Sequence, residues 1–85
     1  MGIKLSEGIT YRIIDGEAVI CNIRTGAVLL LNKTASYVLD LIKKYSSLDK
    51  VIKSYSKYYE CSEAEAEEDI KQLLEQLKIK KIVVF

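Results

Sequence analysis

Apolar positions recur in two-residue steps along the first third of the chain and in three- to four-residue steps along the rest. Residues 9–14 are β-branched and aromatic with partial alternation, and Asp15-Gly16 after them is a strong hairpin signal. Residues 17–23 form a second apolar stretch, Arg24-Thr25-Gly26 a second turn, and residues 27–31 a third stretch. The pattern predicts a three-stranded antiparallel meander.

Helical spacing begins after Asn32, a residue type favoured at helix N-caps, and predicts a helix to about residue 45. Ser47 can cap a second helix that ends near residues 58–59. Ser62 and Glu65 form a capping box for a third helix, whose acidic first turns suit the positive end of the helix dipole. The sequence therefore predicts three helices after the strands.

The order of three strands followed by three helices predicts an α+β fold in which the sheet covers one side of a single core and the helices the other. At 85 residues the chain is long enough for one domain, so we expect residues 1–85 to form it. Residues 1–7 are expected to be flexible. Residues 82–85 are apolar and are expected to form a final strand or a segment packed on the core.

Composition narrows the classes of function. Hydrophobic residues make up 49% of the chain, which excludes a disordered protein, and the net charge of +1 argues against a dedicated nucleic-acid binder. The chain has no His, which removes imidazole metal ligands and His-based catalytic triads. Cys21 and Cys61 form no zinc-binding pattern. We expect no enzymatic activity, no metal and no cofactor, and a cytoplasmic protein that does not engage a membrane.

The third apolar stretch, residues 27–31, is unusual because all five side chains are apolar where a strand with one solvated face would alternate. In the simplest meander this strand lies at an edge of the sheet. Either the chain's own helices or C-terminal tail cover its second face, or a partner strand adds to the edge. The sequence leaves both alternatives open.

Charge is also unevenly distributed. Acidic residues crowd positions 60–69, and lysines precede and follow them. One interpretation is solvated helix faces that complement the helix dipole. The other is a third helix that flanks a groove and selects the charges of a partner.

Three segments in order carry a family resemblance: Asp15-Gly16-Glu17 at a turn, Thr25-Gly26 before an apolar strand, and Leu31-Asn32-Lys33-Thr34-Ala35 opening a helix. This sequence resembles the PqqD family, also called the RiPP recognition element. Residues 69–77 are similar to its closing helix, and the resemblance covers about residues 8–85. The chain departs from the family at Lys80-Lys81, where many members place a glycine.

The resemblance implies a winged helix-turn-helix-like, PqqD-like domain that binds the leader segment of a ribosomally made precursor peptide. It implies that the leader adds as an antiparallel strand beside the third strand, in a cleft walled by the third helix. Carried onto this sequence, the peptide-binding residues are Ala27, Val28, Leu29 and Leu30 on the strand, with Asp69, Ile70, Lys71, Leu74, Leu77 and Lys78 on the helix.

The partner implied by the resemblance is a modifying enzyme. It is a radical SAM enzyme in coenzyme PQQ synthesis, or a leader peptidase and cyclase in lasso-peptide synthesis. The sequence does not choose between them, and we favour a lasso-type or other peptide natural product. The chain is expected to be a monomer or weak dimer.

A winged-helix DNA-binding protein is the alternative, because that fold shares the helices and Lys50, Lys53 and Lys57 lie on the second one. The small net charge and the acidic start of the third helix count against it, since both oppose contact with phosphates.

Overall fold

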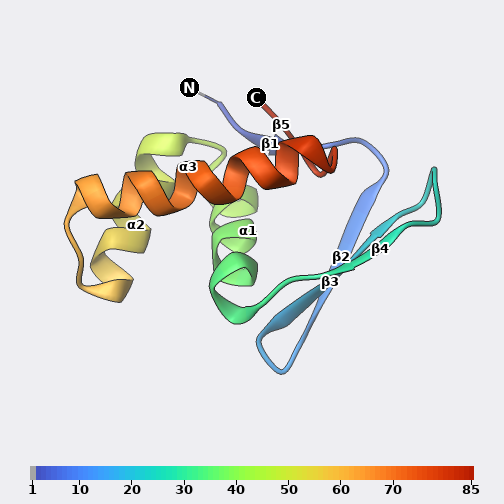
Figure 1. Cartoon of the computed structure of the whole chain (residues 1–85), viewed down its shortest axis with the longest axis horizontal. Helices are drawn as coiled ribbons and strands as arrows, with labels where there is room; N and C mark the ends of the chain where they lie inside the picture. Colours follow the sequence, from blue (N-terminus) through green and yellow to red (C-terminus); the bar gives the residue numbers. More distant parts are fainter. Residues whose placement is uncertain (1) are drawn as a thin grey trace.

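The structure, a computed structural model, describes residues 2–85. A three-stranded antiparallel sheet precedes three helices, which confirms the predicted fold class (Figure 1). In chain order the elements are β1 (Lys4–Leu5), β2 (Ile9–Ile14), β3 (Glu17–Asn22), β4 (Val28–Leu30), α1 (Lys33–Tyr45), α2 (Leu48–Tyr59), α3 (Glu63–Ile79) and β5 (Val83–Val84). No helix within residues 2–85 is both long enough and apolar enough to cross a bilayer.

The larger sheet has the strand order β2-β3-β4, so β4 lies at an edge. The β2–β3 hairpin turns at Asp15 and Gly16, which have φ of 53° and 81°, as a two-residue hairpin with two left-handed residues requires. In the β3–β4 turn, the Asn22 side-chain oxygen accepts hydrogen bonds from the backbone N–H groups of Arg24 and Thr25. Asn22 and Gly26 thus occupy this turn, and both are residue types that favour turns.

The helix caps follow the predicted residues. Asn32 Oδ1 accepts from the backbone N–H of Ala35 at 2.8 Å and starts α1. At the start of α3, Ser62 Oγ accepts from Glu65 N and also donates to its carboxylate, both at 3.1 Å. Ser47 precedes α2 but its side chain makes no cap hydrogen bond. Two of the three caps thus stabilise their helices through the side chain.

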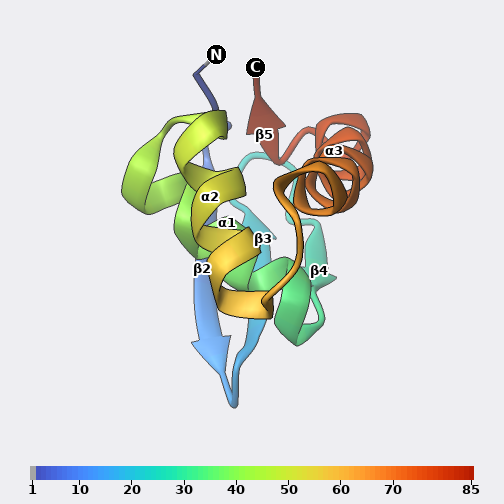
Figure 2. The same cartoon turned by 90° about the vertical axis from the view of Figure 1, so that its left-hand side faces the viewer.

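The core lies between the sheet and the helices. α1 packs on β3, α2 packs on both α1 and α3, and Figure 2 shows α3 on the side of the molecule that carries β4. Buried Ser36 joins the two layers, because its Oγ accepts from the backbone N–H of Ala18 at 2.6 Å and donates to the Asn32 carbonyl at 2.7 Å. This pairing leaves no buried polar atom of Ser36 unsatisfied.

Residues 1–7 are expected to be flexible, but within the described residues Gly2, Lys4 and Leu5 pair with other parts of the chain. Met1 lies outside the described residues, but β1 pairs antiparallel with β5, with Lys4 opposite Val84. Ile3 is only 2% exposed and belongs to the core. Two-residue strands are too short to show a period, so the sequence pattern did not reveal this second sheet. The expected final strand is present at residues 83–84.

The end of α3 accounts for the Lys80-Lys81 departure from the family pattern. Lys81 has φ of 60°, the left-handed conformation that glycine adopts most easily after a helix. The backbone N–H of Lys81 donates to the Lys78 carbonyl and that of Ile82 to the Leu77 carbonyl. The lysine therefore keeps the helix-ending geometry of a glycine, at a steric cost to its own backbone.

Replacing Lys81 by glycine is expected to raise the free energy of unfolding by about 1 kcal/mol, because it removes that steric cost. Urea denaturation followed by circular dichroism measures the change. Lys80→Gly is the matched control, since Lys80 has φ of −82° and gains nothing from glycine. A Lys81→Gly variant no more stable than Lys80→Gly would contradict the interpretation.

Candidate functional site

The outer edge of β4 presents unpaired backbone groups. Antiparallel pairs alternate between residues that face their partner with both N–H and C=O and residues that face away. The bonds from Leu31 N to Ala18 O and from Asn22 N to Ala27 O fix this alternation, so Leu29 also faces β3, opposite Ile20. Val28 and Leu30 then direct their N–H and C=O groups to the open edge, which no other strand within residues 2–85 covers.

The side chains of β4 alternate between the two faces of the sheet. Leu29 points to the helix side of the sheet and packs against the core. Val28 and Leu30 point to the other face, where they are 64% and 72% exposed. Neither the helices nor the C-terminal segment of the described chain covers that face. Packing within residues 2–85 therefore explains the apolar side chains of Leu29 and Leu31, but not those of Val28 and Leu30.

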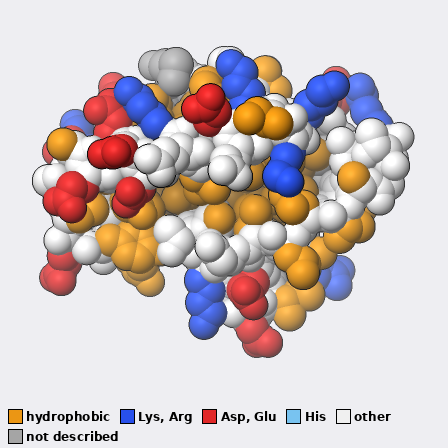
Figure 3. Space-filling view, viewed as in Figure 1, with side chains coloured by type: hydrophobic (Ala, Val, Ile, Leu, Met, Phe, Trp, Pro, Cys, Tyr) orange, Lys and Arg blue, Asp and Glu red, His pale blue; other side chains and the backbone are white. Residues whose placement is uncertain are grey.

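A hollow of about 320 Å³ lies beside Leu29. Its lining combines Ile9, Ile20, Asn22, Thr25, Ala27, Val28 and Leu29 from the sheet side with Lys80, Lys81 and Ile82 from the end of α3. Figure 3 shows hydrophobic side chains gathered below α3, between that helix and the sheet. The floor of the hollow is apolar, and its α3 side carries two lysines.

A second depression lies beyond the end of β4, where α1 begins. It is lined by Asn32, Thr34, Ala35 and Val38 on one side and by Tyr55, Asp69, Gln72 and Leu73 on the other. Tyr55 Oη donates to Asp69 Oδ2 at 3.3 Å. Burial, and then the Asp69 carboxylate, raise the pKa of Tyr55 above its ordinary value, so the hydroxyl stays protonated to a higher pH than that of a free tyrosine. Asp69 of α3 thus lies near the end of β4, and Lys80, just after α3, lies near its start.

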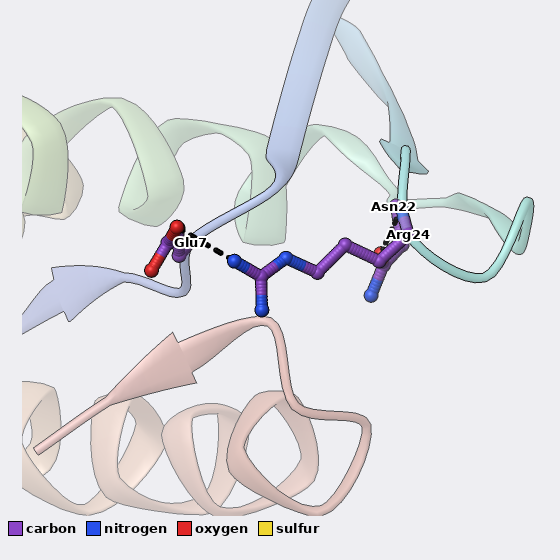
Figure 4. A network of polar contacts seen from close by, with 3 residues as sticks. All are labelled: Glu7, Asn22 and Arg24. Atoms are coloured by element: carbon purple, nitrogen blue, oxygen red, sulfur yellow. Dashed lines mark hydrogen bonds and ion pairs between the residues drawn. The ribbon is translucent and has the colours of Figure 1, made fainter.

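The turn before β4 is braced from the N-terminal side (Figure 4). Arg24 Nη2 forms an ion pair with Glu7 Oε1 at 2.6 Å, and its backbone N–H donates to Asn22 Oδ1. Gly8 has φ of 85°, which favours glycine, and a Cβ there would lie 3.1 Å from Arg24 Cγ, a tight contact with the arginine side chain. Both charged side chains are largely exposed, so this pair positions the turn more than it stabilises the fold.

The structure brings together only part of the predicted binding set. Ala27, Val28 and Leu29 line the hollow, Leu30 follows them on the open edge, and Asp69 lines the separate depression beyond the end of β4. Ile70, Leu74 and Leu77 are at most 2% exposed, so they hold α3 on the core and offer almost no surface to a ligand.

Lys71 and Lys78 lie on another flank of α3. Both line a depression with Leu48 and Phe85, away from β4. Lys71 Nζ pairs with Glu67 at 3.3 Å, and Lys78 Nζ lies 4.5 Å from the centre of the Phe85 ring. The residues that line the two hollows near β4 are instead Leu73 on α3 and Lys80 and Lys81 just after it. In the sequence, Lys80 and Lys81 stand out only because they depart from the family pattern, in which many members have a glycine.

This arrangement suits recognition of an extended chain. An unpaired strand edge offers main-chain hydrogen bonds to any extended segment, and a hollow beside it accepts alternate side chains. The site is open and apolar, and its charged groups stand at the rim, where they contribute more to selectivity than to affinity.

Comparison with known proteins gives consistent matches. The family model of "Coenzyme PQQ synthesis protein D (PqqD)" matches residues 17–83. A solved structure of TbiB1 in complex with the TbiA(beta) leader peptide has a TM-score of 0.87 at 21% identity, covering 94% of this chain and 93% of that one. A structure of lasso peptide synthetase B1 complexed with the leader peptide has a TM-score of 0.86 at 25% identity and covers all of both chains. No curated protein sequence matches this chain.

Proposed function

Because this chain belongs to the PqqD family, we propose that it binds the leader segment of a ribosomally synthesised precursor peptide and presents it to a modifying enzyme. The leader adds as an antiparallel strand to the open edge of β4. Its inward side chains enter the hollow between β4 and the end of α3, and its outward side chains continue the exposed apolar face of Val28 and Leu30.

One observation carries this proposal: β4 combines unpaired backbone groups along its edge with an apolar hollow directly beneath it. An exposed apolar edge strand is an aggregation hazard unless something covers it. A peptide strand satisfies the N–H and C=O groups of Val28 and Leu30 and covers the apolar hollow beside Leu29. The binding free energy then comes from main-chain bonds and apolar burial, with no catalytic group required.

We place the chain with the lasso-peptide type of pathway. The similarity to lasso peptide synthetase B1 extends over the full length of both chains at 25% identity, and that protein is complexed with its leader peptide. On this proposal the partner enzyme is a leader peptidase or cyclase, which receives the peptide from the β4 edge.

Fluorescence anisotropy tests the proposal with a labelled leader peptide, taken from whichever short reading frame near this gene encodes a candidate precursor. Saturable binding at micromolar or tighter affinity is expected, together with loss of binding for a peptide of scrambled sequence. A double-stranded DNA fragment at low salt is the comparison ligand, because a winged-helix DNA binder would prefer it. Binding to DNA, with no binding to the leader at about 100 μM protein, would overturn the proposal.

A further inference from the structure

The hollow beside Leu29 and the depression beyond the end of β4, together called the groove from here on, carry opposite charges. Lys80 and Lys81 line the hollow at the start of β4, together with Ala27 and Val28. Asp69 lines the depression beyond the end of β4. The groove is therefore basic in its hollow and acidic in its depression.

The other charges nearby leave this polarity in place. Arg24, beside the basic end, is paired with Glu7. Lys33, which follows Asn32 in sequence, extends along Gly16 at the hairpin tip: a Cβ there would lie 3.5 Å from Lys33 Cε. The two lysines also outweigh the negative end of the α3 dipole, which amounts to about half a unit charge.

We propose that Lys80, Lys81 and Asp69 select leader peptides by charge polarity: basic on the N-terminal side of the bound segment and acidic on its C-terminal side. This inference rests on the proposed function, because it takes the leader to be antiparallel to β4. An antiparallel strand begins near the end of β4, beside Asp69, and ends near the start of β4, beside the two lysines. The three charged residues thus set the direction and register of a peptide that the backbone edge alone would bind without discrimination.

Two forms of the leader peptide test the polarity. One carries two added lysines before the bound segment and two glutamates after it, and the other carries the exchanged arrangement, so their composition and net charge are equal. An exposed ion pair is worth about 0.2–1 kcal/mol, or roughly 1.5- to 5-fold in affinity. With several pairs changed together, the lysine-first peptide is expected to bind about 10-fold tighter at 50 mM salt. The preference should shrink at 500 mM salt because the charges are exposed.

Protein variants make the test specific. Lys80→Glu/Lys81→Glu is expected to remove or reverse the preference. Lys53→Glu/Lys57→Glu on α2 makes the same change in net charge outside the groove and should keep the preference. If the reversed pair lowers the thermal stability, Lys80→Gln/Lys81→Gln provides the same readout, because loss of both charges should bring the two affinities together.

The outcomes separate this inference from the proposed function. If both peptides bind with equal affinity to the wild-type protein, the charge inference fails and leader binding stands. If the preference survives in both Lys80/Lys81 variants, these residues do not select polarity. If neither added-charge peptide nor the unmodified leader binds, the proposed function fails.

Discussion

Replacing Leu29 by aspartate is expected to lower the affinity for the leader peptide by at least about 100-fold. Leu29 is the β4 residue whose side chain points to the helix side and lines the hollow beneath the edge. A bound peptide strand would cover this position. The aspartate would then lose its hydration beneath the peptide, a cost of several kcal/mol. Lys80 and Lys81 line the same hollow but are exposed, so they offset only part of this cost. About 2.7 kcal/mol is already enough for a 100-fold loss.

Leu30→Asp is the matched control for this prediction. It makes the same substitution one residue along the same strand, on the face where the side chain is exposed. Its carboxylate stays hydrated with the peptide bound, so we expect less than a 10-fold loss. Circular dichroism and thermal unfolding check that both variants fold, and Leu29→Ala is a milder probe if the aspartate variant does not. Equal affinities for Leu29→Asp and Leu30→Asp would place the peptide somewhere other than this hollow.

The sequence was most informative at turns and helix caps, where few residue types are favoured. The Asp15-Gly16 turn, the Asn32 cap and the Ser62–Glu65 capping box all lie where they were predicted. Each depends on a local backbone conformation that few residues favour, so a single chain is enough to detect it. The order of elements followed from these signals and from the hydrophobic period.

The candidate site could be predicted only in part. The sequence pattern assigns residues to a helix or strand, but it does not give the orientation of that helix or strand in the fold. Helical spacing assigned Ile70, Leu74 and Leu77 to an apolar face of α3, but that face packs on the core. Which flank of α3 would meet β4 depends on how the helix rotates about its axis. That rotation follows from packing against α2 and β5, which involves long-range contacts that no local pattern records.

For residues 27–31, the two-residue period of a strand does not show which side chains point inward unless the pairing register is known. Five consecutive apolar residues gave no alternation from which to tell the inward side chains from the outward ones. The register, Leu29 opposite Ile20 and Leu30 opposite Val19, makes that distinction. The same register determines which backbone groups remain unpaired at the edge of β4, and it leads to a second strong expectation about the ligand.

N-methylation of the leader peptide, one residue at a time, is expected to lower affinity at every second position of the bound segment. Only peptide residues opposite Val28 and Leu30 on the edge exchange both N–H and C=O bonds with β4. A methyl group there removes a donor, leaves a β4 carbonyl covered without a partner, and clashes with the strand. The unsatisfied carbonyl alone costs about 1–3 kcal/mol, so we expect losses of about 10- to 100-fold.

The intervening positions are the internal control, because their N–H groups point away from β4 and methylation there should change affinity less than 3-fold. On the protein side, Val28→Pro removes one outward N–H that takes no part in pairing with β3, and edge strands tolerate proline at such a position. Val28→Pro should therefore fold and weaken every leader peptide alike. Leu29→Pro removes an N–H that faces β3 and should destabilise the sheet itself. A methylation profile with a period of three to four residues would instead indicate a helical ligand in the groove, because the period of the losses reports the backbone conformation of the bound peptide.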